Sequence, residues 1–451
     1  MLKLYNTKSR KVENFKPLGD IVKVYTCGPT VYDYAHIGNY TAYIFWDLLV
    51  RVLKFDGYKV RRVLNLTDVG HLVSDSDEGE DKLEKGARKS GKSAYEVADF
   101  FANDFMKNFR ELNLVEPDVI AKATDYVADG MEIVDKMTAG GFTYETTDGV
   151  YFDTSKFPSY ADFAKIDLSG LKAGARVDFS GEKRNASDFA VWKFIQPGEK
   201  HEMRWDYLGR PGYPGWHLEC STIINKELGE PIDIHTGGID HIPIHHTNEI
   251  AQTFAINGCD LSRFWLHCNF ITIDGEKVSK SLGNTYNLND LKERGFSAMD
   301  YKMWVLSGHY RGERNFTFDG LAAAKARRLN WRNKIALCYQ REIPNNQEAL
   351  ARVVEALNSN LNSAEAFSVI DGADFSFSDW EKIEKLFGLG LISDSPNIDN
   401  DISALIFERE EARKARDFSR ADTIRESLKL NGITIEDTPS GPVWQYAEKN
   451  S

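Results

Sequence analysis

The segment 24–39, VYTCGPTVYDYAHIGN, constrains the fold of this chain more than any other. Apolar and polar residues alternate at its beginning, which is the period of a half-buried strand, and Gly28-Pro29 ends that strand. An apolar periodicity typical of a helix then runs from Ile37 to Leu53. This order predicts an open α/β sheet, whose ligand crevice lies at the C-terminal ends of the strands, where Cys27 falls.

The expected helix begins at the four residues His36-Ile37-Gly38-Asn39. Backbone N–H groups at a helix N-terminus have no partner within the helix, and they bind phosphate oxygens well. Gly38 would allow a phosphate to approach the backbone closely. A core histidine at a helix start explains the same four residues, so both interpretations stay open at this point.

Composition restricts the class of protein. The chain has 451 residues, so about three domains are expected. Its net charge of −12 argues against a general nucleic-acid binder, so any RNA contact must depend on local basic patches. Five scattered cysteines do not suggest a disulfide framework, and a reducing cytoplasm is expected. The N-terminal residues do not read as a signal peptide, and the most apolar window is too short to span a membrane.

Later segments predict a sheet that is interrupted by an inserted domain. Lys59–Leu66 reads as a second strand, parallel to the first and joined to it by the helix through a right-handed crossover. From 131 to 194 the pattern changes to short strands and Gly-rich turns. Ile232–His235 then resumes a buried strand that ends in Thr236-Gly237-Gly238. The insertion is therefore expected to separate two halves of one sheet.

Two further segments lie between the second strand and the insertion. The charged stretch 74–93 is expected to be an exposed loop. A helix is expected from Ala94 to about Leu112, and aromatic residues near helical spacing predict a buried face on it. These residues are Tyr95, Phe100, Phe101, Phe105 and Phe109.

Five of the ten histidines fall between His217 and His246. His245 and Glu249 are four residues apart at an expected helix start, so they share one face. With Cys27 and Cys220 they make a candidate Cys₂-His-Glu zinc site, although the spacing is not that of a zinc finger. The alternative is that both cysteines are small buried hydrophobic residues. Other candidate ligands are His235, His241, His246, His267, Cys259 and Cys268.

A second candidate for phosphate contact follows the hairpin predicted at 271–275. Lys277 and Lys280 lie three residues apart in a Gly-flanked loop that contains serine. Lysine is a mobile point charge that can follow a leaving group, so the pair can neutralise a polyphosphate. A solvated charged loop is the default explanation. The order of a strand and helix with His-Ile-Gly, a split sheet and then this loop favours the phosphate interpretation.

Taken together, these motifs resemble the class I aminoacyl-tRNA synthetases, and specifically the cysteinyl-tRNA synthetase family. The matching segments cover the chain from end to end in the family's order. They are YTCGPTVYDYAHIGN (25–39), NLTD (65–68), GWHLECS (215–221), DIHTGGID (233–240), HHTNEIAQ (245–252), KVSKSLGN (277–284), YR with NF (310–316) and ARDFSRADTIR…GITIED (415–437). The family's HIGH motif ends here in Asn39, and its KMSKS motif has Val278 in place of methionine.

The resemblance implies ATP-dependent activation of L-cysteine, followed by transfer to the 3′ end of tRNA(Cys). His36, Asn39, Lys277 and Lys280, with Mg²⁺, are then the catalytic groups that stabilise charge on the transferring phosphate. The positions that match the family's ATP site are Thr30, His36, Gly38, Asn39, Gly238, Asp240, Lys277 and Lys280.

The resemblance also implies one zinc ion per monomer, held by Cys27, Cys220, His245 and Glu249. A soft metal separates cysteine from serine because thiolate is a far better ligand than hydroxyl, whereas an apolar pocket separates the two poorly. The positions that match the family's cysteine pocket are Cys27, Gly28, Thr67, Trp216 and His235.

The domain organisation implied is a Rossmann-like catalytic domain split by an inserted domain, then a helical bundle and a small anticodon-binding domain. The expected ranges are 1–115 with 200–270, 116–199 for the insertion, 271–320 for the KMSKS-loop region, 321–395 for the bundle and 401–451 for the last domain. Leu321–Arg341 holds six basic residues and no acidic one. It is expected either to contact the tRNA backbone or to be a bundle helix with a solvated basic face. A monomer is expected.

Two other functions were compared with this one. A tRNA-independent ligase that joins cysteine to an amino-sugar has no use for segment 401–451, which is present. A non-catalytic RNA-binding paralogue is disfavoured by the intact His36, Lys277 and Lys280.

Overall fold

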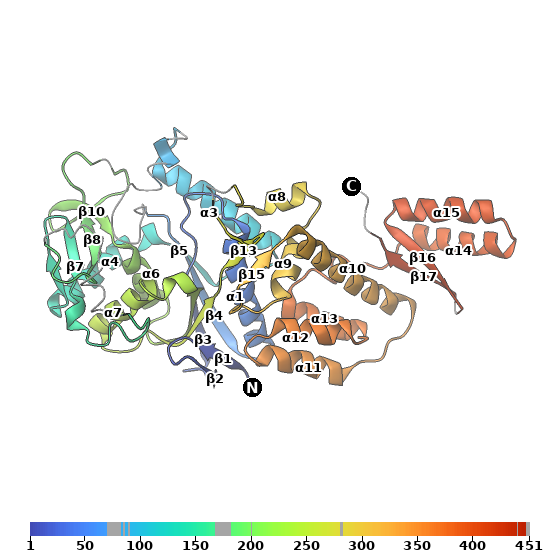
Figure 1. Ribbon diagram of the computed structural model, residues 1–451, viewed down its shortest axis with the longest axis horizontal. Coiled ribbons are helices and arrows are strands. Elements are labelled where there is room, and N and C mark those ends of the chain that lie inside the picture. The colour runs from blue at the N-terminus through green and yellow to red at the C-terminus, as the bar shows by residue number, and fades with distance from the viewer. Residues whose placement is uncertain are drawn as a thin grey trace.

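The computed structural model describes residues 1–69, 83, 86–88, 91–166, 182–199, 201–279, 283–439 and 441–447. The molecule is elongated, with a central parallel sheet, an antiparallel sheet at one end and a small helical domain at the other (Figure 1). The central sheet has the strand order β12-β11-β3-β4-β5. Its strands are β3 (Ile21–Thr26), β4 (Lys59–Leu66), β5 (Val119–Lys122), β11 (Ile232–Gly238) and β12 (Ser262–Cys268).

The predicted first βαβ unit is confirmed. β3 and β4 pair in parallel, and helix α1 (Ile37–Phe55) connects them. The His36 side chain caps α1 by accepting a hydrogen bond from the Asn39 backbone, and the Asn39 side chain accepts one from the His36 backbone. This reciprocal arrangement satisfies two N–H groups at the start of the helix. The predicted helix start at Ile37 is therefore correct to the residue.

Helix α3 (Ala94–Glu111) begins at a Ser93–Glu96 capping box, and the chain continues from it to β5. The expected buried aromatic face is only partly correct. Phe105 and Phe109 are buried, but Tyr95 and Phe100 are 44% and 45% exposed. They lie on the outer side of the helix, where Phe100 packs edge-to-face against Tyr34, while Phe101 contacts Tyr34 and also packs against the core. The segment 74–93 that precedes α3 lies largely outside the described residues.

The second half of the sheet is built by β11 and β12, which continue the parallel pairing from β3. Helix α6 (Trp216–Glu227) precedes β11, and the 3₁₀ turn η3 (Ile239–His241) with helix α7 (His245–Asn257) follows it. The register pairs His235 with Tyr25 and Thr236 with Thr26. Segments more than two hundred residues apart therefore end at the same edge of the sheet (Figure 1).

An antiparallel sheet of five strands, in the order β6-β7-β8-β10-β9, forms the inserted domain. Its strands are β6 (Thr143–Glu145), β7 (Gly149–Phe152), β8 (Phe189–Phe194), β9 (Trp205–Tyr207) and β10 (Arg210–Pro214). Helix α4 (Val127–Ala139) follows the 3₁₀ turn η1 (Ala123–Tyr126) and packs beside this sheet. A second 3₁₀ turn, η2 (Thr154–Lys156), follows β7.

Two expectations about this region need correction. The stretch from 131 to 139 is helical, because Val127, Ile133, Val134 and Met137 recur at helical spacing and are buried together. The strand pairings also differ from the expected range of 116–199. Val119–Lys122 belongs to the parallel sheet, whereas Trp205–Pro214 belongs to the antiparallel one. We therefore propose that the insertion runs from 123 to 214.

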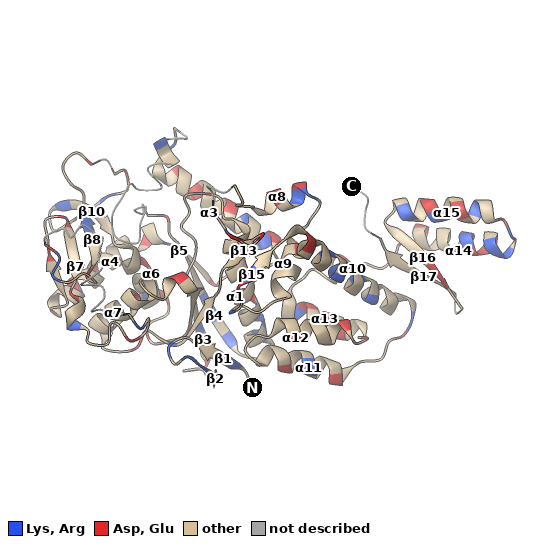
Figure 2. Ribbon diagram, viewed as in Figure 1, with Lys and Arg blue, Asp and Glu red and all other residues tan. Residues whose placement is uncertain are grey.

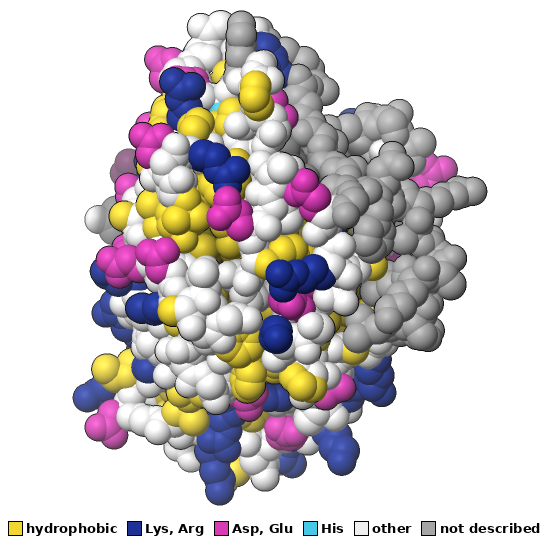
Figure 3. All heavy atoms as spheres, turned by 90° about the vertical axis from the view of Figure 1, so that its left-hand side faces the viewer, with side chains coloured by type: hydrophobic (Ala, Val, Ile, Leu, Met, Phe, Trp, Pro, Cys, Tyr) yellow, Lys and Arg dark blue, Asp and Glu magenta, His cyan; other side chains and the backbone are white. Residues whose placement is uncertain are grey.

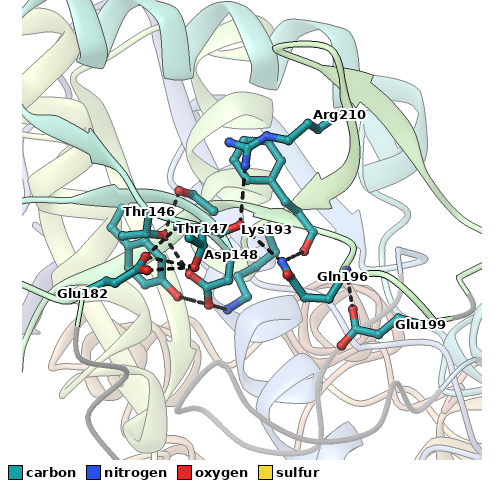
Figure 4. Close-up of polar contacts among 11 residues, drawn as sticks. Thr146, Thr147, Asp148, Glu182, Lys193, Gln196, Glu199 and Arg210 are labelled. Atoms are coloured by element: carbon teal, nitrogen blue, oxygen red, sulfur yellow. Dashed lines mark hydrogen bonds and ion pairs between the residues drawn. The ribbon is translucent and has the colours of Figure 1, made fainter.

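A polar network surrounds the turn between β6 and β7 and includes Lys193 of the central strand β8 (Figure 4). Lys193 donates to Asp148 at 2.7 Å, and Thr147 donates to Glu182. The exposed face of this domain carries interspersed positive and negative side chains between small hydrophobic areas (Figure 3). The contacts of the network described above are made between residues of the inserted domain.

A three-stranded sheet follows the parallel one and is made of β13 (Ile271–Ile273), β14 (Glu276–Lys277) and β15 (Arg314–Phe316). The predicted hairpin is confirmed by the antiparallel pairing of β13 and β14. Helices α8 (Leu288–Glu293) and α9 (Ala298–Leu306) lie between β14 and β15. An N-terminal hairpin, β1 (Lys3–Asn6) with β2 (Lys11–Asn14), packs beside β12.

The helical bundle consists of α10 (Phe318–Gln340), α11 (Gln347–Asn358), α12 (Ser363–Asp371) and α13 (Phe377–Phe387). α10 is a helix of the bundle, as one of the two expectations has it, but several of its basic residues bind groups within the fold and do not form a solvated face. Arg328 is buried and pairs with Asp300 and Asp394, while Lys334 donates to three backbone carbonyls beyond α12 and at its end. These two cations help to hold the bundle together, because each has acceptors on a neighbouring segment.

The last domain pairs α14 (Asn400–Lys414) with α15 (Phe418–Leu430) and ends in the hairpin of β16 (Ile433–Thr438) and β17 (Gly441–Tyr446). Trp444 of this hairpin stacks on Tyr339 of α10. Gln340 donates to the Trp444 carbonyl at 2.8 Å. Both helices carry positive and negative side chains along their surfaces (Figure 2). Among the described residues, no helix has the length and apolar character needed to cross a membrane.

Candidate active site and metal centre

The four predicted metal ligands come together at the C-terminal edge of the parallel sheet. Cys27 follows β3, Cys220 lies in α6, and His245 and Glu249 lie one turn apart in α7. Their ligand atoms are all within 4.8 Å of one another, and all four residues are buried. The backbone N–H of Cys27 donates to the Thr236 carbonyl at 3.1 Å, so the pairing of β3 with β11 determines where the first ligand lies.

The charges of this group are strongly coupled. Burial tends to raise the pKa of Glu249, but His235 and His245 outweigh burial and lower it, so this carboxylate is ionised. Burial tends to lower the pKa of His245, but Glu249 and Cys220 raise it to about 10. Burial tends to raise the pKa of Cys220, but contacts with Cys27 and His245 lower it to about 6. One thiolate and one carboxylate therefore already face each other at neutral pH.

This donor set suits zinc. Two thiols, one imidazole and one carboxylate are ligand types that zinc accepts, and the thiols make the set soft. Nε2 of His245 lies 3.0 Å from Oε1 of Glu249, so these two ligand atoms are close enough to bind the same metal ion. The residues present therefore fit the metal that the sequence predicts.

The structure also brings together a second group of four, which overlaps the first. Cys27 and Glu249 belong to both groups, and His235 and His246 complete the second one. The sequence predicts both as further candidate ligands, and the family resemblance also assigns His235 to the cysteine pocket. Geometry alone thus leaves two ligand sets that share one thiol and one carboxylate.

Each predicted ligand contacts a further buried side chain. His246 Nε2 lies 3.4 Å from Cys27 Sγ, and His217 Nδ1 lies 3.0 Å from His245 Nδ1. His235 Nε2 lies 2.8 Å from Glu249 Oε2. Besides burial, the Cys220 and Cys27 thiols raise the pKa of the Tyr25 hydroxyl, which lies beside them.

Two of these contacts were missed at the level of the sequence. Tyr25 stands two residues before Cys27 on a strand, so both side chains leave the same face of the sheet. The two-residue period of a strand therefore indicates from the sequence that Tyr25 and Cys27 share a face. His217 precedes Cys220 by three residues on a helix, which also favours a shared face, but its contact with His245 depends on how α6 packs on α7.

The predicted cysteine-pocket residues surround the same point. Trp216 begins α6, and its ring lies over His245 with the centroids 4.6 Å apart. Thr67 is buried and accepts a hydrogen bond from the Asn65 side chain. The loop after β3 runs beside Thr67, because Gly28 donates to the Asn65 side chain at 2.7 Å.

A side chain at Gly28 would collide with the backbone carbonyl of Asn65, which explains the glycine at this position. Thr30 forms an isolated bridge with Thr67. The loop from 28 to 31 is therefore held against the end of β4 by backbone contacts. This brings the predicted ATP-site residue Thr30 next to the predicted cysteine pocket.

The helix-start motif differs in one respect from what was expected. The N–H of Ile37 donates to the Tyr286 carbonyl at 2.7 Å, and the N–H of Asn39 is used by His36. Two of the N–H groups at this helix start are therefore already bonded. Tyr286 follows the 277–284 loop, so the two predicted phosphate-binding segments are adjacent.

Gly238 and Asp240 lie at the end of β11 and in η3, beyond the sheet edge. The Asp240 carboxylate lies so close to Gly238 that a Cβ there would collide with it. Lys277 is exposed on β14, and Asn284 accepts from the Ser279 N–H and donates to the Lys277 carbonyl. Lys280 lies outside the described residues.

The chain with this sheet and this site belongs to the class I aminoacyl-tRNA synthetases. Residues 14–326 match the family model described as "tRNA synthetases class I (C) catalytic domain". The chain belongs to this family, the cysteinyl-tRNA synthetases, and is thus an aminoacyl-tRNA synthetase.

Curated relatives resemble the chain over nearly its full length. Cysteine–tRNA ligase 1 of Burkholderia lata is 41% identical over 461 residues, which covers 98% of this chain and 96% of the relative. Cysteine–tRNA ligase of Treponema denticola is 38% identical over 488 residues, with 98% and 99% covered. Among solved structures, Mycobacterium tuberculosis methionyl-tRNA synthetase in complex with methionyl-adenylate has a TM-score of 0.58 at 15% identity, covering 83% of this chain and 89% of that one. This last likeness concerns the fold.

Proposed function

We propose that this chain is a cysteine–tRNA ligase that activates L-cysteine with ATP and transfers it to tRNA(Cys). The observation that carries the proposal is the convergence of Cys27, Cys220, His245 and Glu249 at the edge of the parallel sheet. The printed names of the full-length relatives support the same activity. The end domain of 401–451, which a tRNA-independent amino-sugar ligase would not need, also supports it.

In this proposal Cys27, Cys220, His245 and Glu249 hold one zinc ion, and the metal supplies a soft site for the thiolate of the substrate. Trp216 and Thr67 line the adjoining space and restrict the side chain that enters. Serine lacks the thiolate, so it loses the interaction on which binding depends. Selectivity then needs no separate editing step.

Activation of cysteine is assigned to the neighbouring segments. His36 and Asn39 stand at the start of α1, Gly38 has no side chain that would block a phosphate, and Lys277 of β14 and Lys280 are assigned the positive charge. With Mg²⁺, these groups stabilise charge on the transferring and leaving oxygens. Gly238 and Asp240, at the end of β11, are assigned to the nucleoside, and Thr30 to ATP.

The remaining domains are assigned by position. The end domain, 401–451, is proposed to bind the anticodon, where exposed Phe407 and Phe418 could stack on unpaired bases. Five free cysteines suit a reducing cytoplasm. A monomer is proposed.

The test is ATP–pyrophosphate exchange with purified protein, measured with cysteine and with serine, together with zinc content. Cysteine-dependent exchange, about one zinc per chain and charging of tRNA(Cys) are expected. Exchange without any charging of tRNA would instead support the amino-sugar ligase, and no exchange would support the non-catalytic paralogue.

A further inference from the structure

A buried chain of hydrogen bonds leads from the candidate metal centre to the N-terminal hairpin. His246 Nε2 lies 3.4 Å from Cys27 Sγ, and His246 Nδ1 lies 2.8 Å from His267 Nε2. His267 Nδ1 in turn lies 2.7 Å from the hydroxyl oxygen of Thr7. His246 and His267 are both buried, at 0% and 4% exposure. All four nitrogens of the two imidazoles take part in this series of hydrogen bonds.

The hydrogen bonds in this series must all be donated in the same direction. A neutral imidazole donates through one nitrogen and accepts through the other. The chain can therefore run outward from a Cys27 thiol to Thr7, or inward from the Thr7 hydroxyl to Cys27. A metal-bound cysteine is a thiolate and has no hydrogen to donate. Once Cys27 binds a metal, only the inward direction remains, with the Thr7 hydroxyl as its outermost donor.

We propose that Thr7 and His267 are positioning residues that fix His246 as a hydrogen-bond donor to the Cys27 thiolate. This inference rests on the zinc site proposed above, and it deepens it by distinguishing the two overlapping ligand sets. His246 is then a support for the ligand Cys27 and does not bind the metal itself. Partners of this kind orient the ligands and commonly raise metal affinity by tenfold or more.

The surroundings of His246 support this role. Its ring packs against Trp265, with the centroids 5.0 Å apart. A Cβ at Gly237 would come within 2.7 Å of His246 Cε1, so the backbone of β11 also confines the ring. His235 is the other member of the second set. Its Nε2 lies 2.8 Å from Oε2 of Glu249, and its ring stacks on Trp265. Both extra histidines are thus held in place by groups that are not metals.

Thr7, at the outer end of this series of hydrogen bonds, can be substituted without loss of its backbone contact. Thr7 follows β1, and its backbone N–H donates to the Trp265 carbonyl at 2.9 Å, independently of its side chain. The hydroxyl borders a cavity of about 270 Å³. The residues that line this cavity are Tyr5, Thr7, Arg10, Ile239, Ile242, His267 and Arg311. Replacing Thr7 by valine should remove the donor while keeping the shape and the backbone contact.

The first experiment measures the zinc dissociation constant by competition with a chelator. Thr7→Val is expected to weaken zinc binding severalfold and His267→Phe about tenfold, since the latter breaks the chain nearer the metal. Thr7→Ser, which keeps the hydroxyl, should restore wild-type affinity. Thr253→Val is the matched control, because the Thr253 hydroxyl is buried on the same helix α7 without a hydrogen-bond partner among the described residues. Unchanged affinity in both Thr7→Val and His267→Phe would overturn the proposal.

The second experiment identifies the ligands with cobalt(II) in place of zinc. The sulfur-to-metal charge-transfer band should have the intensity of two thiolates, and Cys220→Ser should reduce it to about half. His246→Gln should keep both thiolates and the coordination number. If Cys220→Ser leaves the band unchanged and His246→Gln alters the coordination, His246 is a ligand and the proposal is wrong. Wild-type protein that binds no metal would instead contradict the zinc site itself.

Discussion

The backbone N–H of Ile37, the first residue of α1, donates a 2.7 Å hydrogen bond to the carbonyl of Tyr286. Tyr286 follows the 277–284 loop, so the two segments proposed to bind ATP phosphates are joined through the backbone. The hydroxyl of Tyr301 donates to the Ile37 carbonyl at 2.7 Å and adds a second tie from α9. The first residue of α1 is therefore anchored through both its N–H and its carbonyl.

His36 is expected to have two separable roles. His36→Ala removes both the helix cap and the imidazole, so it should lower the free energy of unfolding by about 1 kcal/mol and slow adenylate formation. His36→Asn keeps a side chain that caps helices well, so stability should be near wild type while adenylation stays slow. Urea unfolding and single-turnover kinetics measure the two effects. Normal adenylation in His36→Asn would show that the imidazole serves only as a cap.

The two lysines of the 277–284 loop are expected to differ in effect. Lys280→Ala should slow cysteinyl-adenylate formation about a hundredfold, because a charged contact made in the transition state contributes about 3 kcal/mol. Lys277→Ala should have a smaller effect, since this lysine is exposed on β14. kcat should fall with little change in KM for ATP. A normal rate in Lys280→Ala would remove this loop from the phosphate site.

His245 is expected to be indispensable for the metal. His245→Ala should lose zinc and with it the preference for cysteine over serine, because the thiolate of the substrate then has no soft partner. Zinc content by atomic absorption and exchange assays with both amino acids provide the measurement. Cys259→Ala, which changes a cysteine outside both candidate ligand sets, is the control. Full zinc occupancy in His245→Ala would exclude this histidine as a ligand.

A buried ion pair is expected to determine the stability of the catalytic domain. Lys302 Nζ lies 2.8 Å from Oδ2 of Asp47 in the middle of α1, and both side chains are 0% exposed. Lys302→Met should destabilise the fold by about 3 kcal/mol, because it leaves the buried Asp47 carboxylate with Arg51 as its remaining charged partner. The exposed pair of Arg110 and Glu116 is the control, and Arg110→Met should cost less than about 1 kcal/mol.

The same ion pair predicts that the free energy of unfolding decreases at low pH. Burial tends to raise the pKa of Asp47, but Lys302 and Arg51 outweigh burial and lower it from its ordinary value of 3.8. A carboxyl whose pKa is lower in the folded state contributes stability above its unfolded pKa and loses it as the pH falls. The free energy of unfolding should therefore fall below about pH 4. Urea titrations of wild type and of the Asp47→Asn, Lys302→Met double variant should show a shallower fall in the variant.

The end domain is expected to be separable from catalysis of adenylation. A chain that ends at Asn397 keeps every residue assigned to ATP, cysteine and zinc, so cysteine-dependent exchange should remain near wild type. Charging of tRNA(Cys) should fall, mainly through weaker binding. Equal loss of both activities would show that the contact between Trp444 and Tyr339 supports the catalytic core.

Local patterns predicted the central elements well. The end of β3, the start of α1 and the whole of β4 follow from hydrophobic periodicity and from Gly28-Pro29, which act over neighbouring residues. The pairing of His245 with Glu249 likewise follows from helical spacing. The same reasoning was wrong for Tyr95 and Phe100, because the packing of neighbouring segments decided their exposure. The helix at 131–139, by contrast, follows from apolar residues at helical spacing, which is a local signal in the sequence.

The sequence by itself determined which residue types are available: two cysteines, a histidine and a glutamate for the metal, and the motifs at 36–39 and 277–284 for phosphate. Only the tertiary structure decided that Cys27 meets Cys220 and His245, because this depends on the pairing of β3 with β11 and on the packing of α6 against α7. The tertiary structure also decided that Arg328 and Lys334 of α10 bind carboxylate and carbonyl oxygens of neighbouring segments. Periodicity acts over a few residues, whereas such contacts join segments that are close only once the sheet and bundle have assembled.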